Sequence, residues 1–297
     1  MNFYKKPINI LLLAIIATAL WGSAFPAIKI GYQLFNITTV PSKLLFAGVR
    51  FIMAGFLVML FSGFRKLPKE NIKGTLALGF VQTYLQYIFF YISLTYLTGV
   101  KGSILNSIGN FFAVILAHFM LKNDKITAKK LLGCLLGFAG VVLCNFTEGG
   151  IDFNISFMGE GFILIAAFCF ALGSVMTKKV TKNAEPFTVT GIQLFFGGVL
   201  LTISGLVFGG SLEYTGIKAL LMLLYLAILS SVAFSLWSQL LKHNPVGKIS
   251  VYCFLNPVFG VILSGIFLGE DIFNWQSLVA LILVSIGITI VNISDKK

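Results

Sequence analysis

The feature that most constrains this chain is a series of ten apolar stretches, separated by short segments that carry its charges. Each stretch has about the 17–25 residues that a transmembrane helix needs. Charged residues make up only 11% of the 297 residues, whereas a soluble domain contains about a quarter. The composition therefore predicts a polytopic membrane protein. The expected spans are 8–32, 41–63, 74–97, 101–121, 127–146, 158–178, 187–208, 216–241, 247–268 and 275–293.

These spans are expected to be helices, because backbone groups in lipid must be hydrogen-bonded within their own segment. Barrel strands would alternate apolar and polar residues, whereas these runs are continuous. The sequence therefore predicts an all-α fold. The first run follows Lys5 and Lys6, as in a secretory signal, but it continues through Trp21 to Ile30. We therefore expect an uncleaved first helix.

The net charge of +12 is distributed asymmetrically along the chain. If ten helices alternate in direction, 17 of the 22 basic residues fall on one side of the membrane, including both chain ends. The positive-inside rule then places both termini in the cytoplasm, and we expect a bacterial cytoplasmic membrane. In this distribution the charge is a topology signal and predicts no nucleic-acid partner.

The second half of the chain repeats the first. A shift of 147 positions aligns 100–145 with 247–292 without a gap, and Lys101, Gly140 and Asn145 meet identical residues. The alignment predicts two five-helix units, residues 1–147 and 148–297. Because five is odd, the second unit must enter the membrane inverted, an arrangement typical of transporters with a midplane site between the units.

Three motifs carry a resemblance to a known family: "WGSAF" at 21–25, Arg50-Phe51, and "LNPVFGVILSGIFLGED" at 255–271. With them, nearly the whole chain resembles an EamA-type member of the drug/metabolite transporter superfamily. The resemblance implies ten helices in two inverted repeats around a central cavity. It implies that helices 1, 3, 4, 6, 8 and 9 line that cavity, and it leaves the solute open. The first repeat departs from the motif, with Asn110 where the second has Pro257.

Polar side chains within the apolar stretches are the candidate binding groups, because a carboxamide in hydrocarbon needs a partner. Gln82 and Gln86 are one turn apart on the third stretch, whereas Tyr91 is expected to anchor at the membrane interface. Trp237 fits a cavity and an interfacial position equally well. The predicted substrate-binding residues are Trp21, Ser23, Gln82, Gln86, Tyr87, Asn106, Asn110, Ser174, Trp237, Tyr252 and Asn256.

Three further residues are predicted to shape or gate the path. Pro26 and Pro257 each remove a helical hydrogen bond and kink their helices. Arg50 lies well inside the second stretch, where an unpaired arginine costs at least about 2.5–3.5 kcal/mol. It is expected either to hold a substrate carboxylate or to tie helices together through backbone carbonyls.

No Asp or Glu lies clearly within a span, which disfavours a multidrug cation/proton antiporter. A pocket of amides, hydroxyls and aromatic rings suits a neutral or zwitterionic solute. The leading hypothesis is a secondary transporter, not an enzyme, that exports an amino acid or a related metabolite by alternating access. Uptake or exchange of an organic cation is the alternative, since aromatic rings bind quaternary ammonium.

The sequence offers little to other functional classes. The chain has no HExxH motif and no GxxxxGK[ST] loop, so an intramembrane enzyme and direct ATP drive are disfavoured. A channel is disfavoured by the repeat with its paired mid-span breaks. The four cysteines lack metal-site spacing, and no metal or cofactor is expected. Proton or substrate-gradient coupling stays open, as does a monomer or a homodimer.

Overall fold

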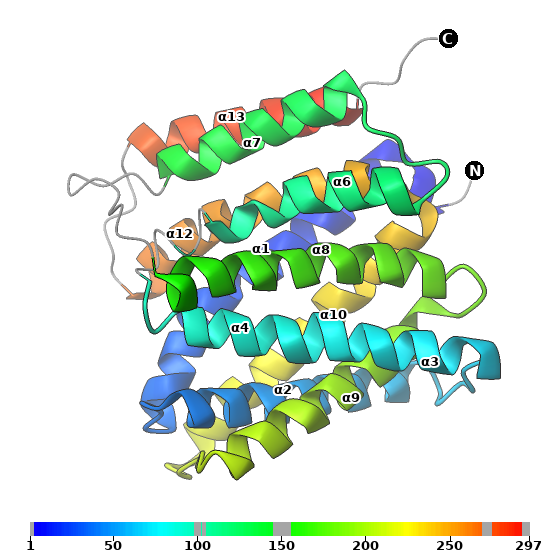
Figure 1. Cartoon of the computed structure of the whole chain (residues 1–297). Helices are drawn as coiled ribbons and strands as arrows, with labels where there is room; N and C mark the ends of the chain where they lie inside the picture. Colours follow the sequence, from blue (N-terminus) through cyan, green and yellow to red (C-terminus); the bar gives the residue numbers. More distant parts are fainter. Residues whose placement is uncertain (1–2, 98–101, 103–104, 145–155, 269–274, 293–297) are drawn as a thin grey trace.

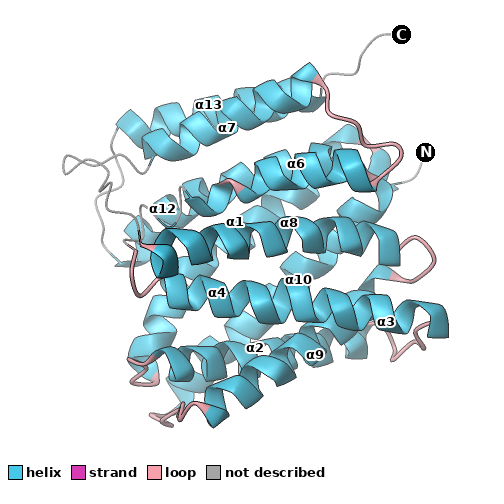
Figure 2. Ribbon diagram, viewed as in Figure 1, coloured by secondary structure: helices cyan, strands magenta, loops and turns pink. Residues whose placement is uncertain are grey.

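The computed structural model describes residues 3–97, 102, 105–144, 156–268 and 275–292. Within these residues it is helical and contains no strand (Figure 2). The main helices are α1 (Pro7–Leu34), α2 (Val40–Phe61), α3 (Lys69–Leu78), α4 (Gln86–Ser93), α6 (Gly109–Met120), α7 (Ala128–Cys144), α8 (Phe162–Val180), α9 (Pro186–Val207), α10 (Ile217–His243), α11 (Val246–Ser250), α12 (Leu255–Leu268) and α13 (Trp275–Asn292).

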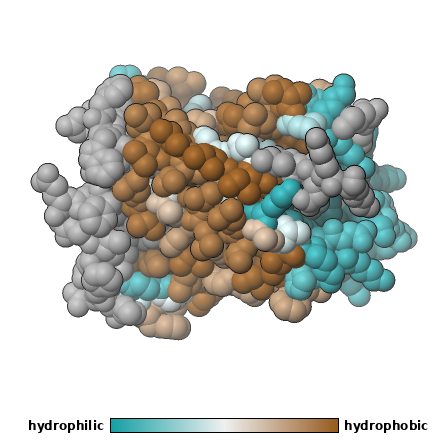
Figure 3. All heavy atoms as spheres, turned by 90° about the horizontal axis from the view of Figure 1, so that it is seen from above, coloured by the Kyte–Doolittle hydropathy of each residue, from teal (hydrophilic) through white to brown (hydrophobic). Residues whose placement is uncertain are grey.

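Six helical segments are long and apolar enough to cross a membrane: 7–34, 40–61, 69–93, 157–180, 186–207 and 217–243. Shorter apolar helices occupy the other four predicted stretches. Large apolar side chains face outward, with Phe61 86% and Phe119 79% exposed. Hydrophobic residues form a broad band across the face seen in Figure 3. The predicted polytopic, all-helical membrane fold is confirmed, and the count of ten spans stays a prediction.

The helices pack in pairs that repeat across the two halves. α2 lies along α9 at one edge of the bundle, and α7 lies along α13 at the opposite edge (Figure 1). Between these pairs, α1 packs against α10 and α12, while α8 packs against α4 and α6. The 147-residue shift relates α1 to α8, α10 to α4 and α12 to α6. The contacts that α1 makes with the second half therefore have counterparts in the contacts that α8 makes with the first half.

Glycine allows α2 and α9 to approach closely. A Cβ added to Gly198 would lie 2.7 Å from the Ile52 nitrogen and 2.9 Å from the Gly48 oxygen. One added to Gly55 would lie 2.4 Å from the Phe195 nitrogen. All of these neighbours are backbone atoms, so a side chain would force the helices apart. Small residues at such seams are the usual basis of helix association in lipid.

Two helices are interrupted at equivalent places. α11 and α12 are joined by η4 (Val251–Phe254), a 3-10 turn that ends three residues before Pro257. In the first half, a turn at Ile108 separates the helical residues 105–107 from α6. The shift of 147 places Ile108 at Leu255, which follows η4. The first copy therefore keeps the break although Asn110 replaces the proline.

One end of the bundle is basic and tightly cross-linked. α1 begins and α13 ends there (Figure 1), and hydrophilic residues gather at this end (Figure 3). Lys178 donates to the carbonyl oxygens of Leu241 at 2.8 Å and Asn244 at 2.6 Å, which joins α8 to the end of α10. Asp124 accepts a hydrogen bond from the Gly247 nitrogen at 3.1 Å. These contacts cross-link the helices at the basic end.

Candidate functional site

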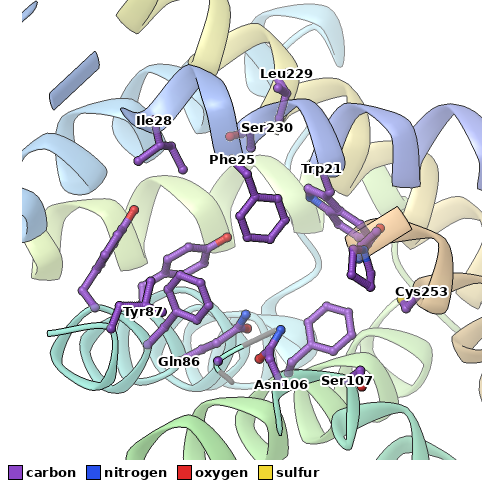
Figure 4. A pocket seen from close by; sticks show the side chains of 18 of the residues that line it. Trp21, Phe25, Ile28, Gln86, Tyr87, Asn106, Ser107, Leu229, Ser230 and Cys253 are labelled. Carbon is purple, nitrogen blue, oxygen red and sulfur yellow. The ribbon is translucent and has the colours of Figure 1, made fainter. Parts of the chain in front are cut away.

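A cavity of about 300 Å³ lies between helices of both halves. It is lined from α1, α2, α4, α8, α10, η4, α12 and the interrupted helix that contains α6. In Figure 4, Trp21 and Phe25 of α1 project toward Gln86 and Asn106 on the opposite wall. The structure brings eight of the predicted residues to this cavity: Trp21, Arg50, Gln86, Tyr87, Asn106, Asn110, Asn256 and Pro257.

The cavity face of α1 follows helical spacing. Trp21, Phe25, Ile28 and Tyr32 recur every three or four residues and line the cavity together. Ser23, predicted to bind substrate, lies off this face, and its hydroxyl is 2.8 Å from both the Leu20 carbonyl oxygen and the Tyr225 hydroxyl of α10. Pro26 is also buried off this face and does not line the cavity.

Gln82 and Ser174 do not line the cavity either. Gln82 is 2% exposed and packs on α8, where a Cβ added to Gly173 would meet its side chain at 2.6 Å. Ser174 is fully buried and donates to the Phe170 carbonyl oxygen at 3.0 Å. Gln82 lies within η2 (Gly79–Leu85), a π-helical segment, whereas Gln86 begins α4. The structure thus separates two glutamines that regular helical spacing would place on one face.

Trp237 and Tyr252 are core residues rather than cavity residues. Trp237 is 2% exposed, and its ring centroid lies 5.2 Å from that of Trp21. Trp237 is six residues from the end of α10 at the basic end, whereas Trp21 is fourteen residues from the start of α1 there. It therefore lies between the cavity and the basic end. Tyr252 is 1% exposed within η4, whose tighter turn places it away from the face of Asn256.

Several polar atoms at the cavity are buried and have no hydrogen-bond partner among the residues that the structure describes. Native proteins satisfy nearly all such groups, so an unsatisfied cluster at a cavity indicates a site for a polar ligand or water. The atoms are Tyr32 Oη, Arg50 Nε and Nη1, Gln86 Oε1, Tyr91 Oη and Asn256 Oδ1.

Arg50 has an aromatic setting. It is 2% exposed, and its guanidinium carbon lies 4.3 Å from the ring centroid of Phe51 and 5.7 Å from that of Tyr87. Cation–π attraction to the rings partly offsets the burial of the charge. Helix ties from Nε or Nη1 to backbone carbonyls, one of the two expectations for this residue, are absent among the described residues.

The cavity also lies between repeat-related residues. Tyr87 and Phe234 are 147 positions apart, as are Asn106 and Cys253, and all four line it. Asn110 and Pro257 form a third such pair. Both members of each pair meet the same space, as expected for a cavity between the two repeats.

Sequence reasoning missed other lining residues. Tyr91 was expected at the interface, yet it is 2% exposed and lines the cavity. Lys29 and Tyr32 of α1 were not among the predicted site residues. The helical spacing of positions 21, 25, 28 and 32 would have indicated Tyr32. The remaining lining residues, mostly apolar, include Phe25, Ile28, Phe90, Phe170, Leu229, Phe234 and Cys253.

Comparison with known proteins gives a consistent result. Residues 8–146 and 157–293 each match the EamA-like transporter family. The uncharacterized transporter YvbV of Bacillus subtilis is 27% identical over 100% of this chain and 95% of its own length. A probable amino-acid metabolite efflux pump of Escherichia coli is 25% identical over 92% and 91%. A solved crystal structure, 17% identical, superposes over 97% of both chains with a TM-score of 0.79, which shows the same fold. The chain belongs to the EamA-like transporter family.

Proposed function

We propose that this protein is a secondary transporter that exports an amino acid or a related small metabolite across the bacterial cytoplasmic membrane by alternating access. The observation that carries the proposal is the cavity between the repeats, whose largely apolar and aromatic lining includes residues with unpaired polar atoms. Such a site suits a small solute with a polar head and a carbon body. The name of the Escherichia coli relative, a probable amino-acid metabolite efflux pump, supports export of this class of solute.

The position of the cavity supports alternating access. Tyr32 and Leu94 lie near the ends of α1 and α4 that face away from the basic end, and both line the cavity. Toward the basic end, Trp21 packs on Trp237, and the Lys178 and Asp124 contacts join the helices beyond. If the basic end is cytoplasmic, as the positive-inside rule implies, this arrangement corresponds to a state closed to the cytoplasm.

The first experiment compares cells that overproduce the wild type, Gln86→Leu or Gln82→Leu at equal membrane abundance. Gln86 lines the cavity, whereas Gln82 on the same helix packs against α8, so the second variant is the matched control. Mass spectrometry of medium and cell extract is expected to show one solute enriched outside with the wild type and Gln82→Leu. With Gln86→Leu the enrichment falls several-fold.

Equal export by all three strains would remove Gln86 from the path. Greater retention of a supplied solute inside the cells would reverse the direction that we propose. Enrichment of a quaternary ammonium compound would favour the organic-cation alternative. In proteoliposomes, an initial rate that rises linearly with solute concentration, without saturation, would indicate a channel instead of a transporter.

A further inference from the structure

Arg50 is a buried cation, and two of its three nitrogen atoms lack an acceptor among the described residues. It lies in α2, is 2% exposed and lines the cavity. The two unpaired atoms are Nε and Nη1. A buried charged group with unpaired donors is unfavourable, and ionisable residues at membrane depth are usually functional.

The residues around Arg50 determine which chemical group can bind to its guanidinium. Phe51 and Tyr87 lie within cation–π distance of the guanidinium, at 4.3 and 5.7 Å. The Tyr87 hydroxyl accepts one hydrogen bond from the guanidinium, but the ring faces offer no strong acceptor, and Nε and Nη1 stay unpaired. A carboxylate is planar, accepts only, and matches two guanidinium N–H groups at once. The hydroxyls of Tyr32 and Tyr91, which line the same cavity, interact with each other, and this pair has one O–H left to donate to the solute.

The rest of the wall fits the remainder of such a solute. Gln86 Oε1 and Asn256 Oδ1 are unpaired acceptors that an ammonium group can satisfy. Trp21 and Phe170 supply an aromatic surface for a carbon body. None of the described lining residues is Asp or Glu, so a solute that carries only a positive charge meets Arg50 without a carboxylate in the described wall.

We propose that Arg50 binds the carboxylate of the transported solute. The protein then selects solutes with a free carboxylate over the corresponding amides and over amines that lack one. This inference rests on the transport function proposed above and adds the chemical group by which the solute is recognised. It also assigns the residue that determines the selectivity.

Binding can be tested on the purified, full-length protein in detergent, by the ligand-induced shift of its melting temperature. The probes are L-leucine and L-phenylalanine, each with its amide and with isoamylamine or 2-phenylethylamine as the matched amine. Arg50→Gln and Arg50→Lys are compared with Arg65→Gln, because Arg65 is the second arginine of the chain and is exposed. Counterflow of labelled L-leucine and L-phenylalanine in proteoliposomes measures transport separately.

We expect at least one free amino acid to stabilise the wild type saturably, and its amide and amine to bind at least tenfold more weakly. Arg50→Gln is expected to lose at least tenfold in affinity for the acid. Arg50→Lys, which lacks the planar fork, should recover part of it, and Arg65→Gln should bind as the wild type does.

Equal affinity of the wild type for acid and amide would overturn the inference, as would the absence of binding by every free acid. This comparison needs no variant, so it decides the question even if Arg50→Gln does not fold. Acid-selective binding that depends on Arg50, without counterflow, would refute the transport proposal and retain the carboxylate site. Saturable counterflow that the amide and the amine inhibit as strongly as the acid does would refute the carboxylate site and retain the transport proposal.

Discussion

The close contact of α2 and α9 predicts a measurable cost for one added methyl group. In Gly198→Ala, the new Cβ would lie 2.7 Å from the Ile52 nitrogen, 2.9 Å from the Gly48 oxygen and 3.0 Å from the Phe51 carbonyl carbon. None of these backbone atoms can rotate away. To restore the nearest contact to the 3.4 Å of ordinary packing, the helices must separate by about 0.7 Å.

The magnitude follows from dispersion. About 50 atom pairs at about 0.15 kcal/mol each give about 8 kcal/mol along such a seam, and a gap of this size forfeits roughly a quarter to a half of it. The higher helix propensity of alanine offsets about 1 kcal/mol of this loss. The net destabilisation is therefore about 1–3 kcal/mol, or about 2–10 °C in the melting temperature for a chain of this size.

The assay is thermal unfolding of the purified protein in detergent, followed by tryptophan fluorescence. Gly74→Ala is the matched control, because Gly74 is half-buried and the one neighbour of its added Cβ is a side-chain atom, Val180 Cγ2, at 3.0 Å. We expect Gly74→Ala to melt within about 2 °C of the wild type, since one side chain can shift by a few tenths of an ångström without separating two helices. If Gly198→Ala melts at the same temperature as the wild type, the argument that backbone atoms limit the approach of α2 and α9 is refuted.

Three further predictions concern other contacts. Lys178→Met removes the donor that joins α8 to the Leu241 and Asn244 carbonyls, and should lower stability by about 1–2 kcal/mol in the same melting assay, whereas Lys179→Met on the exposed face should not. Asp124→Asn removes the carboxylate that pairs with Lys130 and accepts a hydrogen bond from the Gly247 nitrogen. This change is expected to loosen the basic end and to speed proteolysis of the loop between α6 and α7. Unchanged cleavage would contradict the role assigned to Asp124. Pro257→Ala should raise the melting temperature but slow counterflow, because a straighter α12 gains a hydrogen bond; faster transport would contradict a role for the kink.

The fold was predictable from the sequence because the bilayer imposes strong and simple rules. Apolar length predicted where the helices lie, and the shift of 147 predicted which helices are related. Both depend on many residues at once, so local errors average out. The interruption at Ile108 was harder to predict, since the first repeat lacks the proline that marks the second.

The site was predictable only where helices are regular. On α1, ordinary helical spacing gives the cavity face, and Trp21 lies on it while Ser23 does not. Gln82 lies in the π-helical η2 and Tyr252 in the 3-10 turn η4, and no residue type marks such segments reliably. Trp237 lies in the core because it packs on Trp21. This is a tertiary contact, which the spacing of residues along one helix does not predict.

The two copies contribute different chemistry to the cavity. The first supplies Gln86, Tyr87, Asn106 and Asn110, whereas the positions 147 residues later hold Ala233, Phe234, Cys253 and Pro257. Two copies with the same polar groups would offer a solute two equivalent orientations. At these positions most of the polar contacts come from the first repeat, together with Arg50, whereas the second repeat adds only Ser230 and Asn256 to the described polar lining. In the proposed rocking motion, most polar contacts of the solute then stay with the first repeat while the largely apolar wall of the second moves past its carbon body. Divergence of the motif at Asn110, which weakens the sequence match between the repeats, is on this reasoning what gives the site a defined orientation.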